Sequence, residues 1–408
     1  MNQHNVKKVC VFTLHSTKDL RVLNKQCRSL QRNGWNVTLI AVANKHLDQN
    51  AIIGEYDDDG IKVIGVEKWS SLWGRLKTMF KITKLASKEN ADLYHFHDPY
   101  LFVPALLLKL KVRKPFVYDI HEYYNVVVSQ RSFPDIWPLR QIINGMIWCT
   151  ETLLGSLFRN ISTVCNEHRR RFEILGCRTV HTPNYASITD FAPKPVSDQE
   201  WRDRMNKVIF IGSLVPERCV LLIPEIARLV KKVKPEVKFL VIRRFHNEAH
   251  EKAVMDKFNQ PEYKDVITFI PNVSGKELPN VVRGAGIALS VDQPTTRISL
   301  TSQPTKIYEY MSQGLAIVAS KLPSTIDCIG NIGCGVLVKP DDPKAYADAI
   351  VDLLNNPEKI KRMGAVGQNA FKGKFNWSIV EKRLVDFYES ILKNDKKILK
   401  NHKYDNDR

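Results

Sequence analysis

The 408-residue sequence predicts an α/β protein with two doubly wound domains in tandem, each built on a parallel sheet. Runs of apolar and β-branched residues alternate with stretches of helical periodicity along nearly the whole chain, as expected where helices cover both faces of a parallel sheet. A stretch with three prolines and few large aliphatic residues, 183–200, interrupts this alternation near the middle. The length also suits two domains of about 150 to 200 residues better than one large core.

In the first half of the chain, short apolar runs predict strands and the longer amphipathic stretches between them predict helices. The expected strands are Val9–Leu14, Val37–Ala43, Ile61–Val66, Leu93–His97, Phe116–Ile120 and Ile161–Cys165. The expected helices lie within Leu20–Asn33, Trp69–Lys88 and Ile136–Phe158.

A second alternating series follows the proline-rich stretch. Its expected strands are Val208–Ile211, Val237–Ile242, Val266–Ile270, Ile287–Val291, Ala316–Ala319 and Gly335–Val338. A final helix is predicted over Trp377–Leu392, where apolar residues recur at helical spacing, and a polar tail follows it. The chain thus divides into a first domain, a linker, a second domain, and a C-terminal helix with its tail: 1–182, 183–200, 201–374 and 375–408.

The composition is that of a soluble globular protein, with 44% hydrophobic and 25% charged residues. No apolar run approaches the ~20 residues needed to span a bilayer, and the N-terminus lacks the apolar core of a signal peptide. The eight cysteines are scattered without a Cys-x-x-Cys pair, which favours free thiols in a reducing compartment. We therefore expect a cytoplasmic protein.

The formal net charge of +18 favours anionic partners, namely phosphorylated ligands, acidic lipid headgroups or nucleic acid. Both halves of the chain are basic, so the charge alone selects none of these. The sequence shows no helix-turn-helix, zinc finger or RNA-binding aromatic signature, and we do not expect nucleic acid as a partner.

The strongest chemical signal lies in residues 302–320 (SQPTKIYEYMSQGLAIVAS). Pro304 suits the first turn of a helix, and Gly314 suits the position just beyond its end. The N-terminus of such a helix binds anions through unpaired backbone N–H groups and a positive dipole end. Lys306 in the first turn adds a full positive charge, and the Glu309 carboxylate suits two ribose hydroxyls. The alternative is an ordinary helix with Lys306 and Glu309 as a solvated pair.

A glycine turn after the first strand of the second domain gives a weaker signal of the same kind. Gly212 and Ser213 allow the backbone to approach a ligand closely. The planar guanidinium of Arg218 could then bind a diphosphate. The alternative is an ordinary surface arginine.

His95 and His97 stand two residues apart at a strand end, so both side chains project to one face. A metal site would need further ligands, and none follows at a standard spacing. No metal is therefore expected.

Residues 68–88 (KWSSLWGRLKTMFKITKLASK) combine an apolar, tryptophan-containing pattern at helical spacing with six basic residues and no acid. An interfacial membrane helix needs this combination of an apolar and a basic face. A domain helix with a solvated basic face is the equal alternative.

Several motifs, in order along the chain, resemble those of family 4 glycosyltransferases of the GT-B fold. LHSTKDLRVLNKQCRSLQRNGWNVTLIAV resembles the family's first strand, loop and helix, and ADLYHFHDPYLFVPALLLKL and FVYDIHEYY resemble its paired histidine segments. VIFIGSLVPERCVLLI resembles the start of its second domain, and residues 302–320 resemble its nucleotide-sugar site. Phe375–Trp377 and the helix after it resemble the segment that crosses back to the first domain. The resemblance covers about residues 7–393.

The resemblance implies two Rossmann-like domains and assigns roles to residues at matching positions. The implied donor-binding residues are Gly212, Ser213, Arg218, Thr305, Lys306 and Glu309. The implied acceptor-side residues are Asp19, Arg21, His95, His97 and Asp98. The implied catalytic residues are His121, which lies near the donor sugar, with Arg218 and Lys306. The chain departs from the family pattern at Thr301, where many relatives have a glutamate, and at Cys219, where a glycine is usual.

The resemblance further implies a retaining, metal-independent transferase that uses a nucleoside diphosphate sugar as co-substrate and no other cofactor. Basic relatives extend lipid-linked saccharides in capsule or exopolysaccharide biosynthesis, which implies a saccharide acceptor and a peripheral location on the inner face of the cell membrane. Two alternatives remain open at this point. One is a sugar-nucleotide epimerase or phosphorylase on the same scaffold, and the other is a non-catalytic saccharide- or membrane-binding module.

Overall fold

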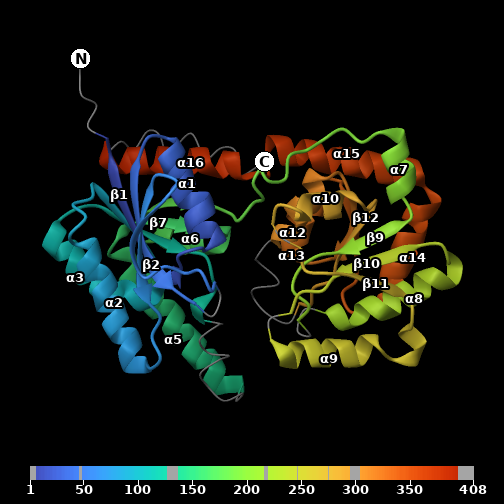
Figure 1. Cartoon of the computed structure of the whole chain (residues 1–408), viewed down its shortest axis with the longest axis horizontal. Coiled ribbons are helices and arrows are strands. Elements are labelled where there is room, and N and C mark those ends of the chain that lie inside the picture. The colour runs from blue at the N-terminus through green and yellow to red at the C-terminus, as the bar shows by residue number, and fades with distance from the viewer. Residues whose placement is uncertain are drawn as a thin grey trace. The chain divides into compact units, whose positions relative to one another are not determined.

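The computed structural model divides into two compact units, Met1–Asn184 with Ile379–Arg408 (unit 1) and Tyr185–Ser378 (unit 2) (Figure 1). Each unit is built on its own sheet with helices on both faces, so the predicted fold class is confirmed. The structure describes residues 6–45, 48–125, 137–215, 219–245, 247–273, 275–294 and 304–393. Within these ranges, no helix has both the length and the apolarity that crossing a membrane requires.

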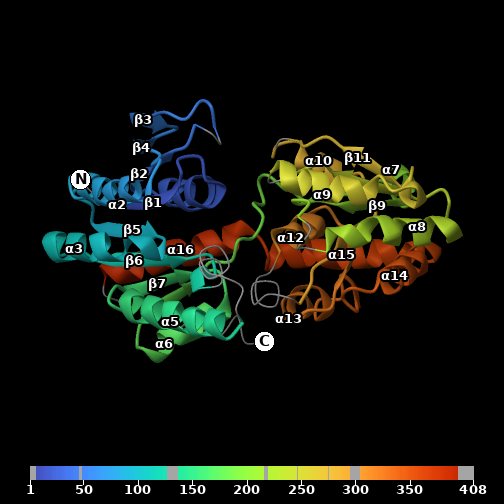
Figure 2. The ribbon, with the colours of Figure 1, turned by 90° about the horizontal axis from the view of Figure 1, so that it is seen from below.

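Unit 1 contains an eight-stranded sheet in the order β3-β4-β2-β1-β5-β6-β7-β8. Figure 2 shows this order from β3 to β7. The strands are β1 (Lys8–Ser16), β2 (Asn36–Ala43), β3 (Gly54–Asp58), β4 (Ile61–Glu67), β5 (Leu93–His97), β6 (Phe116–Ile120), β7 (Arg159–Thr163) and β8 (Arg178–His181). Every pairing is parallel except β3 with β4. The six strands predicted for this half are all present, with ends displaced by two residues at most.

Two strands of unit 1 were not predicted. The edge strand β3 (GEYDD) is too polar to show a strand pattern and pairs antiparallel with β4 through a turn at Asp59–Gly60. Both turn residues have positive φ, 47° and 79°, which is the geometry that Asp-Gly hairpins adopt. The other strand, β8, is only four residues long.

Helices cover both faces of the unit 1 sheet. One face packs against α2 (Leu72–Ala86), α3 (Phe102–Val112), α5 (Trp137–Ser156) and α6 (Asn166–Ile174). The other packs against the π-helical segment η1 (Leu20–Cys27), α1 (Arg28–Arg32) and α16 (Trp377–Leu392). A short 3₁₀ turn, η2, spans Pro99–Leu101. The predicted C-terminal helix is confirmed, and from Ile379 onward it belongs to unit 1.

Unit 2 contains a six-stranded parallel sheet in the order β11-β10-β9-β12-β13-β14. Its strands are β9 (Lys207–Phe210), β10 (Lys238–Ile242), β11 (Ile267–Ile270), β12 (Ile287–Ser290), β13 (Ala316–Ser320) and β14 (Gly335–Val338), each within one residue of its prediction. Its helices are α7 (Asp198–Arg204), α8 (Ile223–Val233), α9 (Glu248–Phe258), α10 (Leu278–Arg283), α12 (Thr305–Ser312), α13 (Pro323–Thr325), α14 (Pro343–Asn355) and α15 (Pro357–Gly373). Shorter turns are η4 (Val220–Leu222), η5 (Pro261–Tyr263) and the π-helical η6 (Ile326–Gly330).

The end of the predicted linker is helical. Helix α7 begins at Asp198 because Ser197 and Glu200 form a capping box. The Glu200 N–H donates to Ser197 Oγ over 3.2 Å, and the Ser197 N–H donates to Glu200 Oε2 over 2.9 Å. The three final residues of the 183–200 stretch therefore form the first turn of a helix.

Each sheet has a point where the strand order changes direction. In unit 1 this point lies between β1 and β5, and in unit 2 between β9 and β12. Ligands of open α/β sheets bind beyond the carboxyl ends of the strands at such points. The sheet topology therefore indicates where to look for functional groups in each unit.

Candidate functional site

A cavity of about 290 Å³ lies beyond the carboxyl ends of β9 and β12 in unit 2. Its wall combines the loop after β9 with the first turns of α12. Five of the six residues predicted to bind the donor line it: Gly212, Ser213, Thr305, Lys306 and Glu309. The structure thus brings together two motifs that lie about 90 residues apart in the sequence.

Helix α12 is held in place by buried hydrogen bonds in its second half and just beyond its end. The hydroxyl of Tyr310 accepts a hydrogen bond from the Ile211 N–H over 3.0 Å and donates to the Leu289 carbonyl over 3.1 Å. Buried Arg204 donates to the carbonyl of Gly314 over 2.8 Å, just beyond the helix end. These contacts join the helix to both β9 and β12, so its first turn is fixed at the cavity.

Lys306 places its positive charge at the wall of this cavity. Its Nζ lies 3.6 Å from Asp292 Oδ2 and 4.7 Å from the ring centroid of Phe210. Gly212 has a φ of 121°, and a Cβ there would lie 4.0 Å from Lys306 Cδ. A side chain at Gly212 would therefore be conformationally strained and would occupy space beside the lysine.

The start of α12 has the properties of an anion site. Pro304 is the N-cap, its side chain makes no capping hydrogen bond, and the first turn contains no acidic residue. The N–H groups at the start of a helix carry the positive end of its dipole, which attracts an anion. With Lys306 beside them and the Glu309 carboxylate on the same wall, the cavity suits a phosphate group linked to a hydroxyl-bearing moiety.

Two positions of the predicted donor side, Arg218 and Thr301, lie outside the described residues. The residue after Arg218 is informative, because Cys219 adopts a left-handed conformation with φ 57° and ψ 14°. Glycine favours this conformation, and other residues enter it at a cost of about 1 to 2 kcal/mol. The buried Cys219 thiol donates to Asp341 Oδ1 over 2.9 Å, which helps to offset that cost.

In unit 1 a second group of polar side chains lies at the β1–β5 switch point. His15 Nε2 lies 3.2 Å from Asp98 Oδ1 and 3.0 Å from His121 Nε2. Asp98 is buried and also accepts a hydrogen bond from Tyr124 Oη over 2.7 Å. The His15 and His121 side chains keep 26% and 12% of their surface exposed. These two imidazoles therefore form the accessible rim of the group.

Asp119, at the end of β6, joins the buried part of this group. Its carboxylate accepts hydrogen bonds from Gln26 Nε2 over 2.7 Å and Ser162 Oγ over 2.6 Å, and it pairs with the Arg21 guanidinium at 3.2 Å. Burial alone would raise the pKa of Asp119, but Arg21 and the neighbouring histidines hold it well below its usual range. Burial lowers the pKa of His97 to about 3, so this imidazole is neutral at physiological pH.

The residues predicted for the acceptor side differ in how deeply they are buried. Asp19 caps η1 by accepting from the backbone N–H groups of Arg21 and Val22, each over 2.9 Å. The Arg21 side chain is buried and donates to the carbonyl of Thr182 over 3.0 Å. His95 and His97 have no exposed surface. In this structure these buried side chains support the His15–His121 rim from beneath.

His95, His97 and Asp119 place three potential metal ligands within 4.8 Å of one another. Sequence spacing missed the third group because it comes from the neighbouring strand. The Asp119 carboxylate, however, already pairs with the Arg21 cation and accepts two further hydrogen bonds. A metal ion there would stand beside a guanidinium, so we interpret the group as a buried cluster of charged and polar side chains around Asp119.

Sequence reasoning missed His15 and Asp119. Both residues stand at the carboxyl end of a predicted strand, within or beside a motif that was recognised. Strand order was the missing information, because only the pairing of β1 with β5 and of β5 with β6 brings these ends together.

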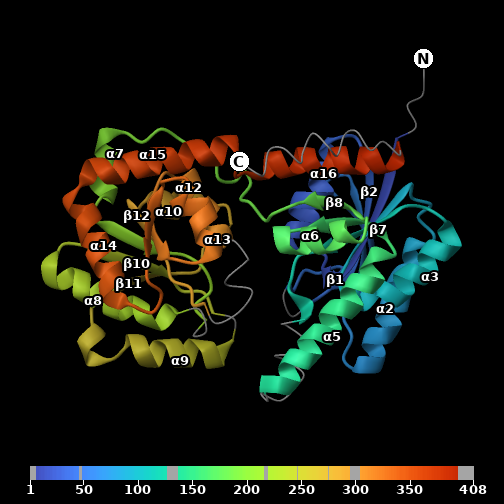
Figure 3. The same ribbon diagram turned by 180° about the vertical axis from the view of Figure 1, so that it is seen from behind.

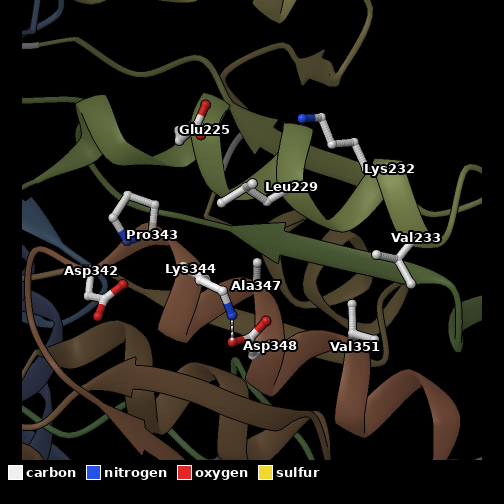
Figure 4. A pocket seen from close by; sticks show the side chains of 10 residues that line it. All are labelled: Glu225, Leu229, Lys232, Val233, Asp342, Pro343, Lys344, Ala347, Asp348 and Val351. Carbon is white, nitrogen blue, oxygen red and sulfur yellow. Dashed lines mark hydrogen bonds and ion pairs between the residues drawn. The ribbon is translucent and has the colours of Figure 1, made fainter.

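A larger groove of about 510 Å³ lies between α8 and α14 (Figure 4). Its apolar floor contains Leu229 and Val351, and its rim carries the Lys344–Asp348 ion pair. The groove is open between two helices and does not lie at the switch point of the sheet. Its size alone does not make it the functional site. The smaller cavity is the better candidate because Lys306, Glu309 and the start of α12 line it.

Two family models match the chain, one in each unit. Residues 21–184 match the glycosyl transferase 4-like domain, and residues 195–370 match the glycosyl transferases group 1. The phosphatidyl-myo-inositol mannosyltransferase of Mycolicibacterium smegmatis is 22% identical over 370 residues, 89% of this chain and 87% of that protein. The capsular polysaccharide biosynthesis glycosyltransferase CapM of Staphylococcus aureus is 18% identical over 396 residues, 92% of this chain and 96% of that protein.

Solved structures show the same fold. Sucrose-phosphate synthase of Thermosynechococcus elongatus superposes with a TM-score of 0.71 at 15% identity, covering 95% of this chain and all of that one. Anabaena HepE, solved in complex with UDP-glucose, gives a TM-score of 0.68 at 14% identity and covers 94% of this chain and 99% of that one. Both likenesses extend over both units.

Proposed function

The chain belongs to the glycosyltransferases of the GT-B fold, and we propose that it moves a sugar, with retention of configuration, from a nucleoside diphosphate sugar to a lipid-linked saccharide. The cavity at the β9–β12 switch point carries this proposal. It offers Lys306 and the α12 N-terminus to a diphosphate, and Glu309 to the hydroxyls of a ribose.

In the proposed reaction, the acceptor hydroxyl approaches C1 of the sugar on the face from which the diphosphate departs. The new C1–O bond forms as the bond between C1 and the phosphate oxygen breaks, and the hydroxyl proton passes to the departing phosphate. Negative charge develops on that phosphate in the transition state. Lys306, the α12 N-terminus and Arg218 would stabilise this charge, which is the role that a metal ion has in other transferases.

We assign the acceptor to unit 1. The accessible rim formed by His15 and His121 lies at the switch point of that sheet. His121 keeps an imidazole edge exposed while its Nδ1 lies 3.4 Å from Asp119 Oδ1. We propose that the exposed part of this imidazole contacts the donor sugar during turnover.

The lipid-linked acceptor is supported by two separate observations. Relatives that match most of the chain are named phosphatidyl-myo-inositol mannosyltransferase and capsular polysaccharide biosynthesis glycosyltransferase. In addition, residues 68–88 expose lysines and apolar side chains together on α2, as anchoring at an anionic membrane surface requires. We therefore propose surface polysaccharide biosynthesis on the inner face of the cell membrane.

A thermal-shift screen with nucleotide sugars tests the donor assignment first. A ligand at 100 times its dissociation constant should stabilise the protein by about 2.7 kcal/mol. The ligands that bind are then incubated with lipid-linked saccharide acceptors, and the anomeric configuration of the product is determined by NMR. Release of the free sugar phosphate, an isomerised donor, or binding without turnover would each contradict transfer and support an alternative reaction or a binding module.

A further inference from the structure

Three neighbouring helices of unit 1 leave a large apolar surface uncovered. Helices α2, α3 and α5 pack on the same face of the sheet. Lys109 of α3 donates a hydrogen bond over 2.5 Å to the carbonyl of Leu157, which follows α5. This hydrogen bond connects α3 to the end of α5. The large apolar side chains exposed on the three helices are Leu72, Trp73, Leu76, Phe80, Val103, Leu107, Leu110, Leu139, Ile142, Met146 and Leu153.

The first half of α5 exposes apolar side chains along one side of the helix. Leu139, Ile142 and Met146 are 41%, 61% and 65% exposed and lie on one side of the helix at i, i+3 and i+7. From residue 139 to residue 150 no residue of α5 is buried, and the first buried residue is Glu151. Figure 3 shows this half of α5 extending beyond the sheet. Exposed apolar patches of this kind mark sites of contact with a protein or a membrane.

The charges around the surface are of one sign. The spans of α2 and α3 contain no acidic residue, and the single acid of α5, Glu151, is buried and paired with Arg171 at 2.8 Å. Exposed lysines alternate with the apolar side chains at Lys77 and Lys81 on α2 and at Lys111 on α3. A bilayer with anionic headgroups offers both the apolar phase and the negative charge that such a surface requires.

We propose that the first half of α5 inserts into the interface of an anionic bilayer, while the lysines of α2 and α3 bind its headgroups. Pairing with a second copy of the chain is less favourable, because it would bring two lysine-bearing surfaces together without carboxylates between them. The inference rests on the proposed lipid-linked acceptor and extends it. Because α5 runs antiparallel to the strands, its first half lies toward the carboxyl edge of the sheet, where His15 and His121 lie.

Cys149 offers a native probe of insertion. It is the exposed cysteine of the eight and continues the row of Leu139, Ile142 and Met146, whereas the other seven thiols are buried. The full chain is labelled at Cys149 with an environment-sensitive fluorophore and mixed with phosphatidylcholine–phosphatidylglycerol vesicles. Insertion should shift the emission to the blue, and lipids brominated in the acyl chains should quench it.

The test variant is Leu139→Ser/Ile142→Ser/Met146→Ser. It should lose the blue shift and, at high salt, bind vesicles at least about tenfold more weakly, because less apolar surface leaves water. The control is Leu20→Ser/Val233→Ser, which removes apolar side chains that are 69% and 61% exposed on η1, on the opposite face of the unit 1 sheet, and on α8 of unit 2. The control should behave as the wild type.

Nucleotide-sugar binding, measured by thermal shift, should be the same in all three proteins. If the wild type binds no nucleotide sugar but still responds to vesicles, the donor site is refuted and the inference about α5 is not affected. An unshifted probe on vesicles, or an equal response from the triple variant, would overturn the inference. A blue shift that grows with protein concentration in the absence of vesicles would also overturn it, because a second copy would then cover α5.

Discussion

His15 Nε2 lies 3.2 Å from Asp98 Oδ1, so a histidine at the end of β1 and a carboxylate at the end of β5 meet where the unit 1 sheet changes direction. Burial alone would lower the pKa of His15, but the Asp98 carboxylate outweighs it and raises this pKa to about 9. Burial alone would raise the pKa of Asp98, yet His15 holds it well below its usual range. His15 is therefore cationic at neutral pH, beside His121.

This ion pair predicts a specific pH dependence of stability. Folding raises the pKa of His15 from 6.5 to about 9, so its contribution is complete below pH 6.5 and is lost as the pH rises through 9. The free energy of unfolding should fall by up to roughly 3 kcal/mol across this window. Urea unfolding at a series of pH values measures the fall. The fall should be smaller in His15→Gln and in Asp98→Asn, and an identical slope in the wild type and both variants would contradict the pairing.

Glu309→Gln should weaken donor binding. The carboxylate lines the cavity at the start of α12, and its replacement removes charge-assisted hydrogen bonds to ribose hydroxyls while keeping the shape. Hydrogen bonds to charged groups contribute about 1.5 to 3 kcal/mol, so the dissociation constant of the nucleotide sugar should rise by roughly 10- to 100-fold. Calorimetric titration measures it. Glu236→Gln, at an exposed position of unit 2, is the control, and equal affinities in the two variants would refute the role.

The fold was predictable because most strands of the two sheets are continuous apolar runs. Phe116–Ile120 is buried at every position and carries a clear signal, whereas Gly54–Asp58 is a polar edge strand and carries none. Helix α2 lies within the predicted stretch, but the apolar pattern did not fix its first residue. Ser71 accepts a hydrogen bond from the Gly74 N–H over 3.1 Å and starts the helix at Leu72, so Trp69 lies before it.

The candidate site was predictable where its residues are close in sequence. Lys306 and Glu309 lie on one short helix, and the helix start and its terminal glycine were both recognisable. His15 could not be connected to Asp98 in this way, because strand order brings them together across 83 residues of chain. The exposed half of α5 escaped notice for a similar reason. Its apolar periodicity is the same whether a helix buries that side or leaves it uncovered.

Activity should persist after treatment with EDTA. The proposed mechanism assigns charge neutralisation to Lys306, Arg218 and the α12 N-terminus, and the Asp119 carboxylate of the His95–His97–Asp119 group is already paired with Arg21. Transfer of radiolabelled sugar, measured before and after chelation, should change by less than about twofold. Chelation removes none of the groups that stabilise the charge on the departing phosphate. Loss of turnover that Mg²⁺ or Mn²⁺ restores would show that a divalent cation takes part.

Fewer basic side chains of α2 are exposed to solvent than the sequence predicted. Arg75 lies 3.8 Å from the ring centroid of Tyr100 and 5.4 Å from that of Trp69, so this cation packs against aromatic rings. The exposed positive charges of the helix and its end are Lys77, Lys81, Lys84 and Lys88, and Trp73 is 76% exposed beside them.

Reversing the charges on this face should abolish binding to anionic membranes. Each basic residue near such a surface contributes about 1 kcal/mol, so Lys77→Glu/Lys81→Glu/Lys84→Glu should lower vesicle affinity by more than about 100-fold at moderate salt. Co-sedimentation with phosphatidylcholine–phosphatidylglycerol vesicles measures this loss. The matched control, Lys232→Glu/Lys252→Glu/Lys264→Glu, makes the same change of net charge at exposed positions of unit 2 and should bind as the wild type does. If both triple variants lose binding equally, the overall charge of the protein, rather than α2, attracts the membrane. If the wild type does not sediment with the vesicles, α2 is an ordinary domain helix with a solvated basic face.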